Sequence, residues 1–265
     1  MEKRRVVITG MGAITPIGKT AEESWVAAKA GVCGIDTIQQ YDTSKMKVKV
    51  AGEVKDFQAE DYLERREARR MDRFTQFAMV AAAQAMEQSG LDLEQEDAAR
   101  CGVAVSSGIG GMTTIQNECL KGAEKGFDRV SPFFIPMIIP NIAAGQIAIK
   151  YGLQGMCTCP VAACAGGSNA VGDAFRHIRD GYAEVMVCGG AESTIAEIGM
   201  GGFTSLHAVT TVSDPARASI PFDAERSGFV MGEGAGILVL EEYEHAKARG
   251  AKILGEIVGY GVNCD

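Results

Sequence analysis

The chain has 265 residues, enough to bury a sizeable hydrophobic core in one large domain or two small ones. Its net charge of −8 argues against nucleic acid as a partner, because proteins that bind polyanions usually carry an excess of positive charge. The N-terminal stretch MEKRRVVITG lacks the apolar segment of a signal peptide, and no apolar run reaches transmembrane length. We therefore expect a cytoplasmic protein with no membrane partner, whose eight cysteines are reduced thiols.

Apolar runs and turn residues predict strands that alternate with helices. In chain order they predict a strand over 5–10, helices over 20–31 and 71–90, a strand over 101–108, a helix over 170–181, strands over 184–190 and 234–240, a helix over 241–250 and a strand over 252–262. Thr20 as an N-cap and the closing glycines Gly90 and Gly181 mark helix ends. The alternation favours an α/β architecture, and we expect a largely parallel sheet whose strands are buried on both faces. The charged stretch 60–73 and the mixed segment 118–135 are expected to be surface excursions.

Two features resemble cofactor sites but do not fit them. GMGAIT follows the first predicted strand, yet Thr15 stands where a dinucleotide-binding loop needs its third glycine. Cys157, Cys159 and Cys164 lack the paired spacing of a zinc site, and no fourth ligand is near in the sequence. We expect Cys157 and Cys159 to be buried strand residues, and we expect neither a cofactor nor a metal.

The three histidines are weak candidates for a catalytic base. His177 lies inside the helix that follows Cys164, too far along it to reach that thiol. His245 belongs to a charged helix and is expected to be solvated. His207 follows a glycine-rich stretch, which fits either the lining of a cleft or a surface position.

Cys164 is the strongest candidate for a reactive group. It lies where a strand-like stretch gives way to a helical pattern, so its sulfur is expected near the unpaired N–H groups of a helix N-terminus. Such a position favours the thiolate, which is the reactive form. The small residues on both sides, in AACAGG, leave room for a substrate. From the residues alone, a buried cysteine at a tight strand–helix turn is the alternative.

Several long motifs resemble one enzyme family. They are RRVVITGMGAITPIG, AVSSGIGG, SPFFIP, AACAGGSNAVGDAF, VMVCGGAES, GGF, IPFDAERSGFVMGEGAG and LEEYEHAKARGAKI. Together they cover the whole chain in order. They resemble the elongating β-ketoacyl-acyl carrier protein synthases of bacterial type II fatty acid synthesis, most closely the synthase II branch.

The resemblance implies a thiolase-like α/β fold, a layered α-β-α-β-α sandwich of two similar halves, and a homodimer that needs no cofactor. It identifies Cys164 as the nucleophile that accepts an acyl group from acyl carrier protein, and the Cys164 backbone N–H as an oxyanion-hole donor. Malonyl-carrier protein would then lose carbon dioxide, and the resulting carbanion equivalent would attack the Cys164 thioester. The implied acyl-pocket residues are Gly108, Ile109, Phe134, Ala163 and Phe203.

The carrier protein of this family is acidic, and the resemblance implies that it docks on two basic elements. One is the helical stretch RREARR, and the other is Lys125 with Arg129 at the same mouth. Basic patches of this kind accelerate encounter more than they add affinity. From the residues alone, a solvated charged helix is the alternative. The arginines of RREARR are Arg65, Arg66, Arg69 and Arg70.

The sequence departs from the family at a few positions near these motifs. Ala162 replaces a threonine before the nucleophile, and Gly166 replaces a serine or threonine after it. Pro160 falls in a stretch expected to be a strand, where its missing N–H would remove a ladder hydrogen bond. Ile220 and Ser227 replace an arginine and an aspartate.

The chain also ends before the two catalytic histidines, the lysine and the glycine-rich oxyanion loop of the family. We therefore expect residues 1–250 to form the N-terminal half of the fold and 251–265 to begin the second half, with the nucleophile present and the decarboxylation machinery missing. The predicted function is that of a 3-oxoacyl-[acyl-carrier-protein] synthase of fatty acid biosynthesis. A polyketide ketosynthase and a non-catalytic partner subunit are the alternatives, and the presence of Cys164 argues against the second of them.

Overall fold

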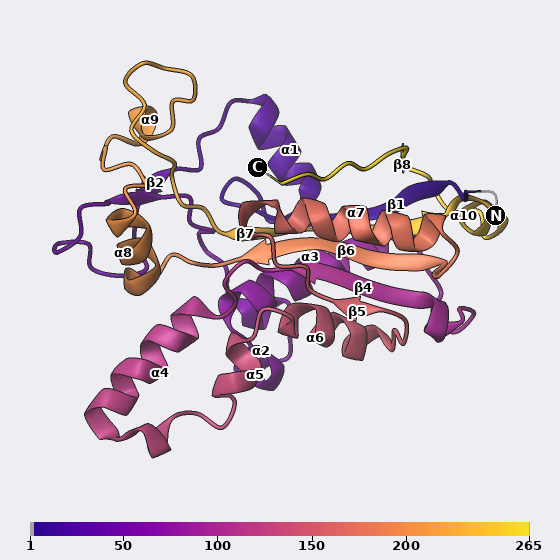
Figure 1. Ribbon diagram of the computed structural model, residues 1–265, viewed down its shortest axis with the longest axis horizontal. Helices are drawn as coiled ribbons and strands as arrows, with labels where there is room; N and C mark the ends of the chain where they lie inside the picture. Colours follow the sequence, from indigo (N-terminus) through magenta and orange to yellow (C-terminus); the bar gives the residue numbers. More distant parts are fainter. Residues whose placement is uncertain (1–2, 265) are drawn as a thin grey trace.

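A six-stranded mixed sheet, in the order β5-β4-β6-β7-β1-β8, organises the protein (Figure 1). The computed structural model describes residues 3–264. A separate two-stranded ribbon pairs β2 (Asp36–Thr37) with β3 (Val50–Ala51). The strands of the main sheet are β1 (Val6–Ile14), β4 (Cys101–Ser106), β5 (Cys157–Thr158), β6 (Val185–Glu192), β7 (Gly234–Glu242) and β8 (Gly255–Ile257).

The expectation of a largely parallel sheet is wrong. β4 runs parallel to both β5 and β6, but the β6–β7, β7–β1 and β1–β8 pairs are antiparallel. The chain leaves β6 and returns in β7 through the long excursion 193–233. That excursion holds α8 (Glu197–Ser205) and α9 (Pro215–Ala218) beyond the end of the sheet (Figure 1). Because no helix crosses the face of the sheet between these strands, β7 starts at the end where β6 stops.

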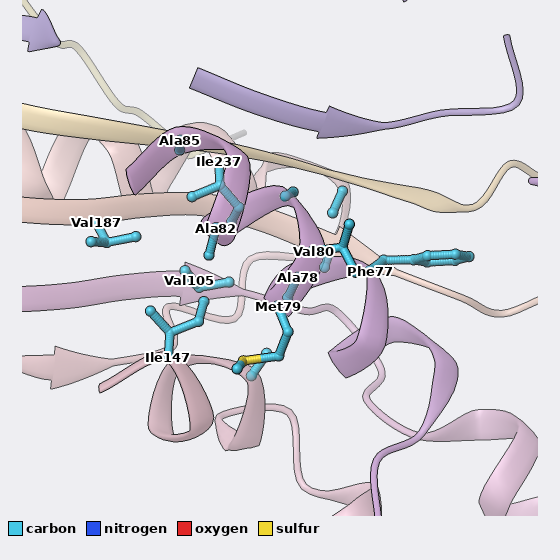
Figure 2. Packing of buried hydrophobic residues seen from close by; sticks show 14 of the residues in the cluster. Phe77, Ala78, Met79, Val80, Ala82, Ala85, Val105, Ile147, Val187 and Ile237 are labelled. Carbon is cyan, nitrogen blue, oxygen red and sulfur yellow. The ribbon is translucent and has the colours of Figure 1, made fainter. Parts of the chain in front are cut away.

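One face of the sheet is covered by α3 (Arg73–Ser89), which packs against β1 and β7, and by α6 (Ile142–Tyr151) beside it. Figure 2 shows small residues of α3, among them Ala82 and Ala85, close to Ile237 of β7. The short side chains let the helix lie directly on the sheet. A Cβ added at Gly12 of β1 would come within 2.0 Å of the Ala81 carbonyl oxygen, so this glycine is required by the close approach.

The opposite face is covered by α7 (Gly166–Arg179), which packs against β4 and β6. Successive residues of a strand pack alternately into the hydrophobic cluster under α3 and the one under α7. Val187 packs on the α3 face, whereas Met186 and Cys188 pack on the α7 face. The expectation that the strands are buried on both faces is therefore confirmed for the central strands β4 and β6, but not for the edge strands β5 and β8.

Helix ends follow the local sequence signals. The Thr20 side chain caps α1 (Ala21–Lys29) by accepting a hydrogen bond from the backbone N–H of Glu23. Gly90 ends α3 in the left-handed conformation with φ 60°. At the C-terminal side, α10 (Tyr243–Ala248) begins later than predicted because Glu241 and Glu242 still belong to β7. The strand predicted over 252–262 is reduced to β8.

The remaining helices lie at the edges of the sheet or project from it. An arm over residues 112–138 projects at the lower left of Figure 1, and four large apolar residues on it, Leu120, Phe127, Phe133 and Ile135, are exposed. No helix within residues 3–264 is long and apolar enough to cross a membrane. The other elements are α2 (Arg65–Ala68), α4 (Met112–Lys125), α5 (Phe134–Ile138), and the 3-10 turns η1 (Ala59–Asp61), η2 (Ala98–Arg100), η3 (Phe127–Arg129) and η4 (Ala163–Ala165).

Candidate active site

Cys164 lies on η4, the tight turn that leads directly into α7, and its side chain is exposed. The loop before it begins at the end of β5, so the cysteine sits between the last residues of a strand and the first turn of a helix. Ala163 has φ 44°, a left-handed backbone conformation that is unfavourable for a residue with a side chain. Backbone strain of this kind occurs most often at functional sites.

The loop that carries Cys164 is held against the end of β4. The Ser106 hydroxyl donates to the Pro160 carbonyl oxygen at 2.7 Å. A Cβ added at Gly166 would lie 2.1 Å from the Ser106 oxygen, which gives a physical reason for glycine where the family has a serine or threonine. Pro160 lies beyond β5, so the expectation that it removes a ladder hydrogen bond is wrong.

A cavity of about 690 Å³ opens beside Cys164. Of the implied acyl-pocket residues, Gly108, Ile109, Ala163 and Phe203 line it together with the cysteine. Phe134 does not line it, because this residue starts α5 on the projecting arm.

Sequence reasoning did not single out several residues that line the same cavity, among them Glu192, Phe229 and Met231. The parallel strands β4 and β6 end at the same edge of the sheet, so the residues after both of them converge there. That rule could have placed Glu192 near the AVSSGIGG motif. Phe229 packs edge-on against Phe203 with ring centroids 5.8 Å apart, a contact between residues on the excursion 193–233 that no local pattern predicts.

Glu192 lies at the end of β6 and accepts hydrogen bonds from the loop after β4. Its Oε2 accepts from the Gly108 N–H at 2.7 Å, and its Oε1 accepts from the Ser107 hydroxyl at 3.0 Å. Burial raises the pKa of this carboxyl, and these hydrogen bonds act in the opposite direction.

Glu233, the second carboxylate of the cavity lining, is held by a cation. Its fully buried side chain forms an ion pair with Arg73 at 2.8 Å and also accepts from the Ser193 hydroxyl at 2.7 Å. The Val54 N–H donates to the same group at 2.9 Å. Glu233 therefore fixes the start of β7 to α3 and to the loop after β3.

The arginines of RREARR lie on and directly after α2 and are exposed. They line a shallow hollow of about 450 Å³ together with Phe133, whose ring centroid is 4.5 Å from the Arg70 guanidinium carbon. Lys125 and Arg129 do not line this hollow, because they end α4 and η3 on the projecting arm. The structure therefore does not bring the two predicted basic elements together in one hollow.

The structure overturns two other sequence expectations, for the strand cysteines and His245, and decides between the two alternatives left open for His207. Cys157 is exposed and Cys159 half-buried, because β5 is a two-residue strand at the edge of the sheet and not a buried one. His245 is not solvated, since its ring nitrogens lie 2.9 Å from carboxylate oxygens of Glu241 and Glu96. His207, for which cleft and surface were both open, is exposed and does not line the cavity.

Comparison with known proteins supplies the family. The model of the β-ketoacyl synthase N-terminal domain matches residues 3–246. The chain belongs to the β-ketoacyl synthase family. It is 49% identical to the 3-oxoacyl-[acyl-carrier-protein] synthase 2 of a Synechocystis species, over 100% of this chain and 64% of that protein. The chain thus spans about two thirds of the length of this curated relative.

Solved structures of ketosynthases share the fold. A β-ketoacyl synthase from Burkholderia phymatum superposes with a TM-score of 0.88 at 36% identity, over 99% of this chain and 65% of that one. A type II polyketide ketosynthase, solved in complex with its acyl-carrier protein and bound to the hexaketide, superposes with a TM-score of 0.82 at 31% identity, over 96% of this chain and 62% of that one. The predicted α/β fold, one half of a thiolase-like architecture, is confirmed.

Proposed function

We propose that this chain carries the acyl-accepting step of a 3-oxoacyl-[acyl-carrier-protein] synthase of fatty acid biosynthesis, with Cys164 as the nucleophile. The observation that carries the proposal is the exposed Cys164 thiol at the start of α7, beside a cavity of about 690 Å³. The 49% identity to a 3-oxoacyl-[acyl-carrier-protein] synthase 2 over the whole chain supports it.

In the proposed step, the Cys164 thiolate attacks the thioester carbonyl of acyl carrier protein. The carbonyl oxygen takes up negative charge, and the Cys164 backbone N–H is one proposed donor to it. The bond between the acyl carbon and the carrier sulfur then breaks, the carrier leaves as a thiolate that is protonated, and the acyl group remains on Cys164. Gly108, Ile109, Ala163 and Phe203 offer the alkyl chain an apolar wall, and burial contributes about 0.8 kcal/mol per CH₂.

In the complete reaction, malonyl-carrier protein loses carbon dioxide and the resulting carbanion equivalent attacks the Cys164 thioester. The new carbon–carbon bond forms as the carbon–sulfur bond to Cys164 breaks, which regenerates the thiolate. This condensation is a proposal for the whole protein, together with a homodimeric state and a cytoplasmic location. The division at residue 250 is part of the same proposal, and the family match ending at residue 246 supports it.

The experiment is acyl transfer from octanoyl-carrier protein, followed by mass spectrometry of the intact chain and of its peptides. We expect one octanoyl group on the wild type, located on Cys164. C119S removes an exposed cysteine on α4 and serves as the matched control, which should be acylated as fast as the wild type. C164A should remain unmodified. Acylation of C164A at the wild-type rate would contradict the proposal.

We propose that the carrier protein docks on Arg65, Arg66, Arg69 and Arg70, because an exposed cluster of guanidinium groups complements an acidic partner. The polyketide ketosynthase complex supports docking of a carrier protein on this family. R66E/R69E should slow acyl transfer by about tenfold or more at low salt, and added salt should narrow the difference. The same charge change at two exposed lysines, K247E/K252E, is the control and should leave the rate unchanged. Equal rates in all three proteins would contradict this docking site.

A polyketide ketosynthase is the second candidate, because the chain is 31% identical to the ketosynthase of the polyketide complex. Carrier proteins of the two pathways separate the candidates. Faster transfer from the fatty acid carrier protein supports the first proposal, and faster transfer from the polyketide carrier protein supports the second. A non-catalytic partner subunit would take up an acyl group from neither.

A further inference from the structure

Glu192 faces the same cavity as Cys164, and the proposed acyl transfer gives it no role. It differs from Glu233, the other carboxylate of the lining, which is neutralised by Arg73. Within residues 3–264, no lysine, arginine or histidine lies within ion-pair distance of Glu192. A half-buried carboxyl group without a cation depends on neutral donors to compensate its lost hydration.

Those donors come mainly from one short segment. The Ser107 hydroxyl donates to one carboxyl oxygen at 3.0 Å and the Gly108 N–H donates to the other at 2.7 Å, so the carboxyl acts here as an acceptor through both of its oxygens. The backbone N–H groups of Ile109 and Ser193 also act to lower the pKa of this carboxyl, against its burial. The Ser107 oxygen additionally accepts from the Gly110 N–H at 2.9 Å, which ties the next turn to the same group.

The segment that Glu192 holds forms part of the wall of the cavity beside Cys164. Gly108 and Ile109 line the cavity. A Cβ added at Gly108 would lie 3.1 Å from Glu192 Oε2 and 3.7 Å from the Ala163 carbonyl oxygen, so the wall is packed between the carboxyl and the residue that precedes Cys164. A displacement of the wall therefore changes the space into which an acyl chain on Cys164 extends.

We propose that Glu192 is a positioning residue that fixes the 107–109 wall and thereby sets how well Cys164 accepts long acyl chains. The inference rests on the proposed acyl transfer to Cys164. Glutamine at this position keeps the size of the side chain but has one acceptor oxygen and one NH₂ group, and the NH₂ group would face the N–H or O–H donors of the wall. The wall would then move and obstruct an alkyl chain that enters the cavity. A small reagent that reacts only with the sulfur would not contact the wall, so its rate would not change.

The experiment compares two probes on the same protein. Iodoacetamide alkylates the Cys164 thiol without filling the cavity, and octanoyl-carrier protein must place its chain along the wall. For E192Q we expect alkylation of Cys164 within about twofold of the wild type and octanoyl transfer slower by about tenfold or more, since small misplacements of a reacting group have large effects on rate. E197Q changes an exposed carboxyl at the start of α8 and is the matched control, with both rates unchanged.

Each outcome decides the inference. An octanoyl rate of E192Q within twofold of the wild type overturns it, and so does an equal loss of alkylation and octanoyl transfer, which would indicate general damage around Cys164. Should E192Q fail to fold, S107A removes one donor and leaves the carboxyl in place, and an octanoyl rate unchanged in S107A overturns the inference. Failure of the wild type to accept an octanoyl group would instead contradict the proposed function.

Discussion

Two carboxylates near opposite ends of β7, Glu192 and Glu241, are held in different ways. At the end that begins with Gly234, the cavity and Cys164 lie close by, and Glu192 on the neighbouring strand is bound by neutral donors alone among the described residues. At the other end, Glu241 is fully buried and forms an ion pair with Arg249. His245 and the Thr9 hydroxyl bond to the same carboxylate, and Thr9 stands at a β-bulge where the register of β1 shifts.

The difference shows that one end of β7 contributes to the stability of the fold, whereas the other end borders the reactive site. Around Glu241, an ion pair and several side-chain hydrogen bonds hold β7, α10 and β1 together. Burial raises the pKa of this carboxyl, but the hydrogen bonds from Arg249, His245 and Thr9 outweigh it, and the pKa falls to about 2. Around Cys164, glycines and alanines remove side-chain bulk, so a cavity remains open. We expect substitutions at the Glu241 end to lower the free energy of unfolding, and substitutions at the cavity end to change reactivity.

The largest expected effect is that of E241A. Removal of this fully buried carboxylate leaves the half-buried Arg249 without its ion-pair partner and His245 with Glu96 alone, and breaking such a buried pair costs about 3–5 kcal/mol. The free energy of unfolding from urea denaturation measures the loss. E244A removes an exposed carboxyl from α10, the helix that follows β7, and should change the stability by less than about 0.5 kcal/mol. A loss below about 1 kcal/mol in E241A would show that the network does not hold this end of the sheet.

G12A tests the packing between β1 and α3. The added methyl group would lie 2.0 Å from the Ala81 carbonyl oxygen, and because that oxygen belongs to the backbone it cannot rotate away. We expect a loss of about 1–3 kcal/mol in the free energy of unfolding. G255A, at a strand glycine with open space around it, is the control. Equal stabilities of the two variants would contradict the close approach.

The pH dependence of stability gives the smallest expected effect. The hydrogen bond to Glu241, with Glu96 on the other side of the ring, raises the pKa of His245 above its ordinary 6.5. Because the pKa of His245 is higher in the folded protein, protonated His245 stabilises the fold. This stabilisation is fully present below pH 6.5 and is lost as the pH rises through the folded-state pKa. Wild type should therefore lose stability relative to H245Q on going from pH 6 to alkaline pH. Parallel stability curves for the two proteins would contradict this.

Glu241 titrates with the opposite sign. Its pKa is about 2 in the folded protein against 4.5 ordinarily, so its stabilising contribution is present above pH 4.5 and is lost as the pH falls toward 2. Acid unfolding of the wild type and E241A, monitored by circular dichroism, should therefore converge at low pH.

Local signals predicted α1, α3, α7 and the central strands but not α6 or α8, and long-range contacts decided how the elements are arranged. Thr20 acts on the first turn of α1, and Gly90 and the helical spacing of the small residues act within α3, so both helices were predictable from nearby residues. The direction of β7 depends on where the excursion 193–233 returns, and no residue pattern encodes that. His245 was expected to be solvated because its partner Glu96 lies far away in the sequence.

In the candidate site, too, nearby sequence signals were predictive and long-range contacts were not. Cys164 could be placed from its own neighbours, and the motif resemblance placed Gly108, Ile109, Ala163 and Phe203 around one cavity. Phe134 could not be placed, since its position depends on an arm that leaves the body of the protein. Glu192 was missed because its contacts come from the loop after a different strand.

The most direct test of the central claim is the relative alkylation rate of the exposed cysteines. The claim is that the thiol at the start of α7 is the reactive nucleophile. Limiting iodoacetamide at neutral pH, followed by peptide mass spectrometry, compares Cys164 with Cys33, Cys119 and Cys157 in the same sample. We expect Cys164 to be labelled before the other three. Labelling of Cys164 no faster than that of Cys33, Cys119 and Cys157 would contradict it.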